Sequence, residues 1–411
     1  MSHVTVIGAG IVGINCAVSL CKAGHQVTVI DRVPPGDGCS FGNAGILAPS
    51  ASEPLAGPDT LLKVPGWLIN PDSPLFIQWR HLPRLTPWLL KYAWAGMFGD
   101  LKAAGAAINP IMAPCIELYT QLAAEAGAPE LISHTGGLYV YESEKKFKAA
   151  RASFLRRRDY GYDFTTLDFN QIQEREPTLS KIYKWGYWVD DYGHVTNPKR
   201  LVDTLADYAR SLGATIELAE VLDIQTGPDG PTALVTDQGT RPLDKLVIAA
   251  GAFSHQLSAK LGDKVPLETE RGYHVMIKNP GAVPSIPVMD SDIKAWITPM
   301  EEGLRCAGTV ELASLDAPEN HHRAEVLLRL AKRMVPTLNA DDYSVWMGRR
   351  PTLPDSIPVI GPATKVANVF YAFGHQHVGL MGAPATANLI SELVSGRNPN
   401  RDISAYRADR F

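Results

Sequence analysis

Residues 1–31 contain a glycine pattern and an acid at the spacing that dinucleotide sites use. Gly8, Gly10 and Gly13 follow the apolar run 4–7 in a Gly-x-Gly-x-x-Gly turn, and Asp31 closes a second apolar run. In such a unit the first glycine makes the tight turn, the second admits a pyrophosphate, and the third lets a helix pack closely on the sheet. The helix N-terminus offers N–H groups to phosphates, and the acid accepts hydrogen bonds from a ribose. This context predicts dinucleotide binding, whereas the alternative is an ordinary strand–helix–strand unit with a glycine-rich turn.

The composition is that of an ordinary globular protein with more than one domain. The chain has 411 residues, of which 45% are hydrophobic and 20% charged, and its length favours two domains. A net charge of −4 gives no electrostatic footprint for nucleic acid. Five cysteines without a Cys-x-x-Cys pair predict neither a disulfide framework nor a zinc site. We expect a reducing, cytoplasmic setting, because the apolar residues from Val4 onward fit a first strand better than a signal peptide.

One segment is apolar and aromatic enough to raise the question of a membrane. No run reaches the roughly 18 apolar residues that a bilayer-spanning helix needs. The segment 88–98, which contains Trp88, Trp94 and Phe98, is interpreted as core or pocket wall, with contact to a membrane surface as the alternative. The basic run Arg156–Arg158 is interpreted as a solvated helix face or turn.

The strand–helix rhythm stops after Asp31 and returns twice later in the chain. Residues 33–90 are rich in Pro, Gly and Trp. Asn197 and Pro198 then predict the start of an amphipathic helix that ends at Gly213, and 245–251 reads as a buried parallel strand. The other expected elements are helices over 102–127, 319–334 and 384–395, strands over 136–141, 214–221 and 369–373, strand-like alternation over 265–278 and 284–312, and a glycine-rich turn over 374–382.

This return predicts an α/β protein with a discontinuous, Rossmann-like nucleotide-binding domain. An antiparallel-sheet (α+β) substrate domain is inserted into it, and the cleft between the two is the expected ligand site. The nucleotide-binding domain is assigned residues 1–60, 190–262 and 345–411, and the substrate domain 61–189 and 263–344.

Five further motifs follow one another in the order of a known family. They are Cys39–Gly45, Val247–Ser254, Gly348–Asp355, Pro358–Pro362 and Gly374–Gly379. Together with the glycine turn, they make the chain resemble FAD-dependent D-amino acid dehydrogenases, within the group that includes glycine oxidase, sarcosine oxidase and D-amino acid oxidase. The resemblance covers nearly the whole chain.

The resemblance implies FAD that is held non-covalently, since no cysteine follows Cys306 where sarcosine oxidases attach their flavin. It places Ile46 and Leu47 against the flavin ring and the backbone of Val221 at the adenine edge. It points the N–H groups of the turn 374–379 at the flavin N1–C2=O edge, where negative charge accumulates on reduction. The residues assigned to FAD are Gly8, Gly10, Ile11, Val12, Gly13, Asp31, Arg32, Ser40, Asn43, Ala44, Gly45, Ile46, Leu47, Val221, Ala250, Gly251, Gly348, Gly374, His375, Gln376, His377, Val378 and Gly379.

The same resemblance gives Arg350 the role of holding the substrate carboxylate, for which a guanidinium fork is well suited. A structural salt bridge between Arg350 and Asp355 is the alternative, and Arg349 is expected on the other face of its strand. Tyr273 could donate its hydroxyl to the same carboxylate or could simply pack in the core. His377 is a candidate pocket residue or a structural histidine. No metal site is expected, because no further ligand joins His375 and His377.

The reaction that this family performs starts with an amino acid whose amine is neutral. Hydride passes from the α carbon to flavin N5, and the imino acid is hydrolysed to a 2-oxo acid and ammonia, whereas a cyclic substrate stops at the imine. Many relatives have a small Gly-His-Gly-Thr-like turn where this chain has Gln376 and His377. That difference fits a cyclic imino acid, such as a D-proline derivative, as well as a general D-amino acid.

Three alternatives remain open at this stage. Arg32 after Asp31 could serve a 2′-phosphate in an NAD(P)-dependent enzyme. The protein could be an oxidase of the amino acid or sarcosine type that uses oxygen, or a non-catalytic flavoprotein subunit of a larger complex. For a dehydrogenase, the electron acceptor would be a quinone or the respiratory chain, with the protein peripheral to the inner face of the cell membrane.

Overall fold

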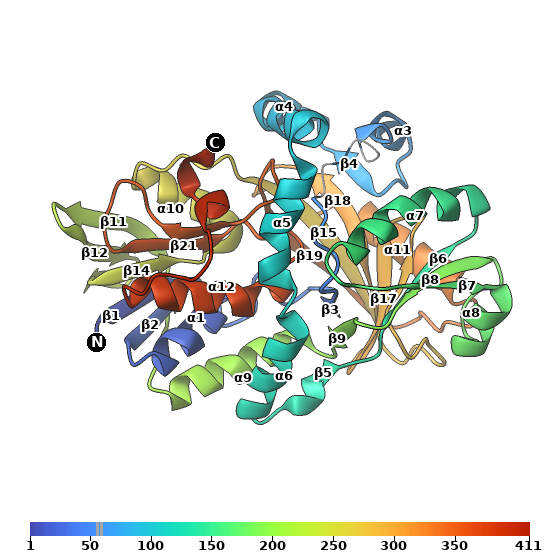
Figure 1. The fold of residues 1–411 in the computed structure, drawn as a ribbon, viewed down its shortest axis with the longest axis horizontal. Coiled ribbons are helices and arrows are strands. Elements are labelled where there is room, and N and C mark those ends of the chain that lie inside the picture. The colour runs from blue at the N-terminus through green and yellow to red at the C-terminus, as the bar shows by residue number, and fades with distance from the viewer. Residues whose placement is uncertain (55–56, 58–60) are drawn as a thin grey trace.

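The computed structural model describes residues 1–54, 57 and 61–411, and it contains two large sheets (Figure 1). The first sheet has six strands in the order β10-β2-β1-β14-β21-β20, which are parallel except for the edge strand β20. Its strands are β1 (His3–Ile7), β2 (Gln26–Asp31), β10 (Thr215–Leu218), β14 (Lys245–Ile248), β20 (Val359–Pro362) and β21 (Val369–Phe373). Segments from three distant parts of the chain therefore meet in one sheet, as the fold-class prediction requires.

Both faces of this sheet are covered by other elements. Successive strand residues point to opposite sides, so each strand contributes apolar side chains to both interfaces. Val4, Val6 and Val247 pack under three helices, while Ile7 and Ile248 pack against a small antiparallel sheet and α10. The three helices are α1 (Ile11–Lys22), α9 (Pro198–Ser211) and α12 (Gly379–Val394); the other cover consists of β11 (Val221–Gly227), β12 (Gly230–Thr236), β13 (Gly239–Pro242) and α10 (Ser254–Lys260).

Helix α9 shows how local sequence sets an element boundary. The Asn197 side chain accepts a hydrogen bond from the Arg200 N–H, and Pro198 occupies the first turn, where its missing N–H costs nothing. The buried stripe that includes Leu201 and Leu205 then faces the core. The predicted helix is confirmed.

The second sheet is a nine-stranded, mainly antiparallel sheet in the order β19-β15-β18-β17-β16-β6-β8-β7, with β4 paired to β18. One face packs on α11 (His321–Met334), and residues of the other face, such as Tyr139 and Trp296, join the core of the first sheet. Its strands are β4 (Leu75–Ile77), β6 (Gly137–Tyr141), β7 (Thr165–Asp168), β8 (Trp185–Val189), β15 (Glu268–Ile277), β16 (Val288–Asp290), β17 (Ala295–Met300), β18 (Gly303–Leu312) and β19 (Tyr343–Thr352).

The fold class is confirmed, while the exact domain boundaries stay a prediction. The first boundary, placed after residue 60, falls next to 58–60, which lie outside the described residues. The predicted strands over 136–141, 214–221, 245–251 and 369–373 and the helix over 319–334 are present with slightly different ends.

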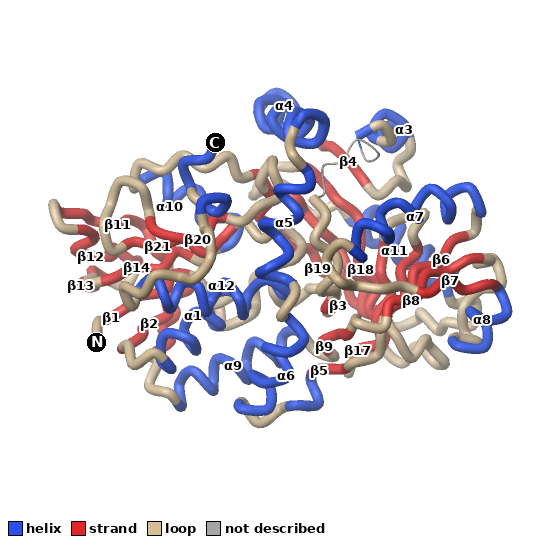
Figure 2. Tube along the Cα trace, viewed as in Figure 1, coloured by secondary structure: helices blue, strands red, loops and turns tan. Residues whose placement is uncertain are grey.

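Three helices form a column between the two sheets in the view of Figures 1 and 2: α4 (Leu82–Phe98), α5 (Leu101–Met112) and α6 (Cys115–Glu125). We predicted one helix over 102–127, which is wrong because Pro114, with no N–H to donate, separates α5 from α6. The predicted start of the last helix at Pro384 is also wrong. Helix α12 begins at Gly379 and carries Pro384 inside it, packed between α1 and α5.

Helix α4 corrects the interpretation of segment 88–98. Trp88 is buried, but Leu90, Trp94, Met97 and Phe98 are exposed, so one face of the segment packs in the core and the other face does not. These four positions recur at the spacing of one helix face. Within the described residues, no helix has the length and apolar character to cross a bilayer.

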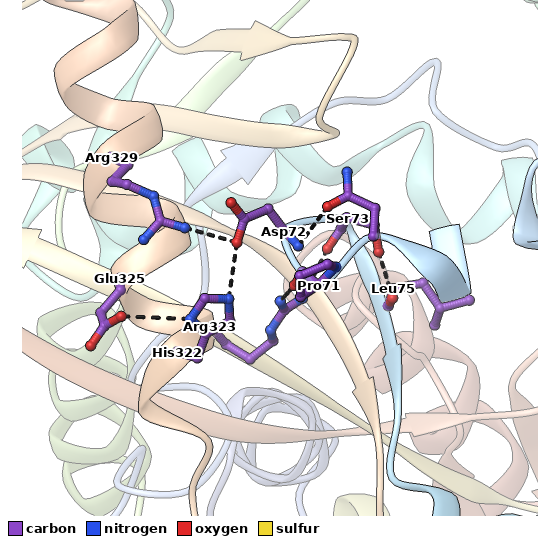
Figure 3. Close-up of polar contacts among 9 residues, drawn as sticks. Pro71, Asp72, Ser73, Leu75, His322, Arg323, Glu325 and Arg329 are labelled. Atoms are coloured by element: carbon purple, nitrogen blue, oxygen red, sulfur yellow. Dashed lines mark hydrogen bonds and ion pairs between the residues drawn. The ribbon is translucent and has the colours of Figure 1, made fainter. Parts of the chain in front are cut away.

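A buried arginine links the segment that precedes α4 to helix α11, which packs on the second sheet (Figure 3). Arg323 of α11 has no exposed surface, and its guanidinium donates to the carbonyls of Pro71 and Ser73. At the surface, the Asp72 carboxylate accepts from Arg329 at 2.8 Å and from His322 at 2.9 Å. These contacts fix the approach to β4 and hence the position of α4.

We therefore expect Arg323→Met to lower the free energy of unfolding by about 3 kcal/mol, because it leaves the buried Ser73 carbonyl and the partly buried Pro71 carbonyl without their donor. Arg329→Met on the same helix removes only an exposed ion pair and should change stability by less than about 1 kcal/mol. Differential scanning calorimetry of both variants measures the difference. Equal effects would show that the buried contacts do not anchor this segment.

Candidate active site

A cavity of about 390 Å³ opens at the carboxyl ends of β1, β2 and β14 and extends to β19. This is the edge of a parallel sheet at which ligands bind, and the volume is in the range of small-molecule sites. Sixteen of the residues assigned to FAD line it: Gly8, Gly10, Ile11, Val12, Asp31, Arg32, Ser40, Asn43, Val221, Ala250, Gly251, Gly348, Gly374, His375, Gln376 and Gly379. Gly13, Ala44, Gly45, Ile46, Leu47, His377 and Val378 lie outside this lining.

The glycines of the first turn are required by close contacts. A Cβ at Gly8, whose φ is +111°, would overlap the Ala249 carbonyl, and a Cβ at Gly13 would overlap the Gly8 carbonyl oxygen. Gly13 therefore acts outside the cavity, by bringing α1 against the strand. At the start of α1, the Ile11 N–H donates to the Ser40 hydroxyl at 2.9 Å. The helix N-terminus thus faces the cavity, with its dipole oriented to attract phosphate.

Asp31 is fixed as an acceptor at the tip of β2. One carboxylate oxygen accepts the Ala9 N–H at 2.6 Å and the other accepts the Val33 N–H at 3.2 Å. Burial raises the pKa of this carboxyl, and the backbone N–H groups of Ala9, Val33 and Arg32 oppose that rise by stabilising the charged form. A carboxylate has about four acceptor sites, so acceptor capacity remains for a ribose hydroxyl.

The neighbourhood of Arg32 is unfavourable for a second phosphate. Its guanidinium lies 3.9 Å from the Phe253 ring centroid and 3.9 Å from the carboxylate of Glu220. Glu220 lines the cavity and was missed, although it follows β10 as Asp31 ends β2, and an acid after a parallel strand is a usable signal. A second carboxylate here repels a 2′-phosphate, which argues against the NAD(P) alternative.

The C-terminal turn contributes an unsatisfied donor. Gln376 has φ = +52°, its N–H donates to the Pro351 carbonyl at 3.0 Å, and its side chain lines the cavity. Its buried amide nitrogen Nε2 has no hydrogen-bond partner in the described part of the chain. A buried donor without a partner is unfavourable by about 1–3 kcal/mol, so this group is suited to an acceptor on a ligand.

The two histidines of the turn have different surroundings. His375 is buried, and its Nε2 pairs with the Thr386 hydroxyl at 3.0 Å, so burial lowers its pKa to about 4. The side chain of His377 is accessible to solvent but has protein atoms around it. This partial desolvation, together with the charge of the Arg350 guanidinium, lowers its pKa to about 4. Both rings are neutral at pH 7. The described residues contain no group of three or more side chains that could hold a metal ion.

Arg350 lies on β19 with its guanidinium over Gly272 of the neighbouring β15, where any Cβ would overlap it. Its Nη1 donates to the Thr309 carbonyl at 3.1 Å. No carboxylate of the described residues lies within 4.0 Å of this guanidinium, and Asp355 pairs with Arg410 at 2.7 Å instead. The alternative of an Arg350–Asp355 salt bridge is therefore wrong.

Glu270 is a buried acid on the Arg350 side of β15 that sequence reasoning missed. It is the register partner of Arg350, and burial raises its pKa while the guanidinium lowers it. Tyr92, on the inner face of α4, is close enough that Glu270 adds to burial in raising the pKa of its hydroxyl. No local pattern marks an acid inside a strand as part of a site.

Tyr273 is buried, in line with the packing alternative, and Arg349 lies on the face of β19 opposite Arg350. Tyr273 points toward α11, where its hydroxyl donates to Glu311 at 2.6 Å and accepts the Asn320 N–H at 2.8 Å. The structure therefore does not bring Tyr273 beside Arg350, because successive residues of β15 face opposite sides. Arg349 lines the dinucleotide cavity while its Nε donates to the Leu315 carbonyl at 2.8 Å.

The glycine turn, the acid and the cavity are typical of a dinucleotide-binding protein, and a guanidinium lies beside that cavity. Comparison with known proteins identifies the family. The family described as FAD dependent oxidoreductase (DAO) matches residues 3–393. The chain is 39% identical to a D-amino-acid oxidase of Bradyrhizobium diazoefficiens over 100% of this chain and 99% of that protein. It is 31% identical to a D-amino acid dehydrogenase of Paramagnetospirillum magneticum over 99% and 98%. The glycine oxidase structure from Geobacillus kaustophilus, 22% identical, has the same fold with a TM-score of 0.78 over 99% and 98% of the chains.

The chain belongs to the FAD dependent oxidoreductase family. The predicted family and the predicted cofactor FAD are confirmed. The residues present fit FAD: a glycine cradle, a carboxylate for ribose and an orphan donor at the C-terminal turn face one cavity. The role of each individual residue stays a prediction.

The glycine contacts predict that Gly13→Ala will bind FAD at least about tenfold more weakly, because α1 must move away from the phosphate site. Gly66→Ala is the control, since a Cβ there meets nothing within 4 Å. The flavin-to-protein absorbance ratio after purification reports the loss, and circular dichroism checks the fold. A folded Gly13→Ala protein with full flavin would contradict this role.

Proposed function

We propose that the protein oxidises a D-amino acid or a cyclic imino acid at its α carbon and, for an open-chain substrate, releases a 2-oxo acid and ammonia. The observation that carries the proposal is the guanidinium of Arg350, which is half-buried and has no carboxylate partner among the described residues. FAD supplies the acceptor for the hydride when it is bound. The names of the relatives, D-amino-acid oxidase and D-amino acid dehydrogenase, support a D-amino acid as substrate.

Each residue near Arg350 has a task in this proposal. The guanidinium binds the substrate carboxylate through two parallel hydrogen bonds and so fixes the α carbon. The Thr309 carbonyl orients the guanidinium by accepting one N–H. His377 stays neutral, because its pKa lies near 4, and its ring can accept a hydrogen bond from the substrate amine. Glu270 offsets part of the arginine charge from its buried position.

The proposal predicts that Arg350→Met raises KM for D-amino acids about 100-fold, because a charge-assisted pair of hydrogen bonds is lost. Arg350→Lys keeps the charge but loses the fork, so its KM should rise about tenfold. Anaerobic reduction of the bound flavin by D-, L- and cyclic amino acids measures both effects. If KM is unchanged in an Arg350→Met protein that retains flavin, Arg350 does not hold the carboxylate.

The electron acceptor distinguishes the two enzyme types that fit this proposal, a dehydrogenase and an oxidase. We favour a dehydrogenase, while the name of the 39% identical relative favours an oxidase that uses oxygen. Stoichiometric peroxide during turnover in air would establish the oxidase, and turnover that requires an added quinone would establish the dehydrogenase. Reduction of the flavin by no amino or imino acid would leave the non-catalytic subunit as the explanation.

The outer face of α4 supports an acceptor that resides in a membrane. Exposed Leu90, Trp94 and Phe98 lie on the same helix as the exposed basic residues Arg84 and Lys91. Aromatic and basic side chains together are typical of a helix that lies on an anionic lipid surface. The inner face of α4 approaches Glu270 through Tyr92, so a lipid contact would bring the site near a quinone pool.

We predict that the protein sediments with vesicles that contain anionic phospholipid, and that Trp94→Ser combined with Phe98→Ser weakens this binding at least about tenfold. Leu222→Ser, which alters an exposed apolar side chain on β11, is the control. Vesicle sedimentation at low and physiological salt measures both. Equal binding by all three proteins would exclude α4 as the contact.

A further inference from the structure

Two further cationic side chains, those of Arg157 and Lys294, lie against the sheet face that carries Arg350. The Arg157 guanidinium lies 5.1 Å from the Tyr139 ring centroid and donates to the Tyr192 hydroxyl at 2.8 Å. Its Nε is buried without a hydrogen-bond partner among the described residues. Tyr139 belongs to the face of the second sheet that meets the first sheet, because it joins the same core as Trp296.

Lys294 is the second cation. It occupies the turn before β17 with φ = +62°, and its side chain is accessible to solvent. Burial lowers its pKa, the nearby charges of Lys63 and Arg157 lower it further, and the charges of Asp292 and Glu53 partly oppose this decrease. Within the described residues, neither Lys294 nor Arg157 has a carboxylate within 4.0 Å.

The acids in this neighbourhood are engaged by other partners. Glu53 accepts hydrogen bonds from Ser153 at 2.6 Å and from Arg156 at 2.5 Å. Asp292 forms an ion pair with Lys146 at 3.1 Å. These acids are shared with other cations, so the neighbourhood of Arg157 and Lys294 keeps an excess of positive charge, which a bound anion would relieve.

Strand β18 connects this pair to Arg350. The Thr309 carbonyl accepts the Arg350 N–H, and the adjacent Gly308 packs against the turn, where a Cβ would lie 3.3 Å from the Lys294 carbonyl oxygen. Neighbouring strands are about 4.8 Å apart, so Lys294 begins about one strand spacing from the strand that Arg350 contacts. A single small molecule can span that distance.

The Arg157 side reaches the predicted flavin path as well. The Tyr192 hydroxyl that binds Arg157 also accepts from the Ser50 hydroxyl at 3.1 Å. Ser50 follows shortly after Ile46 and Leu47, the residues assigned to the flavin ring. The contacts of Arg157 therefore reach the segment of the chain that is assigned to the flavin ring.

We propose that Arg157 and Lys294 form an anion subsite for the distal carboxylate of a dicarboxylic amino acid whose α-carboxylate is bound by Arg350. This inference rests on the proposed function and narrows its substrate class. D-Glutamate and D-aspartate are the probes, and D-glutamine and D-asparagine are their neutral counterparts of nearly equal shape. D-Alanine has no distal group and reports on the rest of the site.

The holoenzyme should reduce its flavin with D-glutamate or D-aspartate at a kcat/KM at least about tenfold above that for the matching amide. Lys294→Met and Arg157→Met should each bring this ratio close to one and leave D-alanine unchanged. Arg158→Met is the control, because Arg158 is exposed and pairs with Asp163. Lys294→Met remains decisive if Arg157→Met does not fold, since Lys294 is solvent-accessible.

A binding measurement separates failure of the subsite from failure of the proposed function. Glutarate should raise the melting temperature of the holoenzyme more than butyrate does, and this excess should disappear in Lys294→Met but persist in Arg158→Met. If no D-amino acid reduces the flavin, the proposed function fails, and the glutarate result alone decides the subsite. An acid-to-amide ratio that Lys294→Met leaves unchanged, or no glutarate excess, overturns the inference.

Discussion

A guanidinium that has no carboxylate partner within the described chain is the feature around which the rest of this site is arranged. Arg350 is partly withdrawn from water, where an unpaired charge is unfavourable. Among the described residues, the Thr309 carbonyl, which accepts a hydrogen bond from the guanidinium, and the nearby charge of Glu270 compensate this charge. In the function that we propose, a substrate carboxylate supplies the missing interaction, and binding free energy is then concentrated at one point beside the cofactor cavity.

The two sheets hold Arg350 in a fixed position relative to the cofactor cavity. The cavity lies at the edge of a parallel sheet, and the glycine turn, the acid and the helix N-terminus that line it are the groups that we expect to hold the dinucleotide. The antiparallel sheet carries Arg350 on an outer strand, and Gly272 leaves room for the guanidinium to lie flat on its neighbour. The segment that leads to α4 is held by Arg323 of α11 and by the pairing of β4 with β18 of the same sheet, so α4 and the site share one support.

Sequence reasoning succeeded where the signal is local. The turn at Gly8 and the cap at Asn197 each depend on a few adjacent residues, and both were predicted. The FAD family was predicted from several short motifs, each of them local. Features that depend on contacts between residues far apart in the sequence were not predicted. The face on which Tyr273 lies depends on the register of β15, which has an irregularity between Arg271 and Tyr273. Lys294 comes near Arg157 only through sheet pairing, and the exposure of α4 depends on its packing partners.

The most direct test of the central claim is a crystal structure of the holoenzyme with a D-2-hydroxy acid bound in place of the substrate. We expect both carboxylate oxygens of that ligand to lie within hydrogen-bond distance of the Arg350 guanidinium, with the flavin in the glycine-lined cavity. A ligand carboxylate held by other residues, with Arg350 turned to solvent or paired with an acid of the protein, would contradict the account.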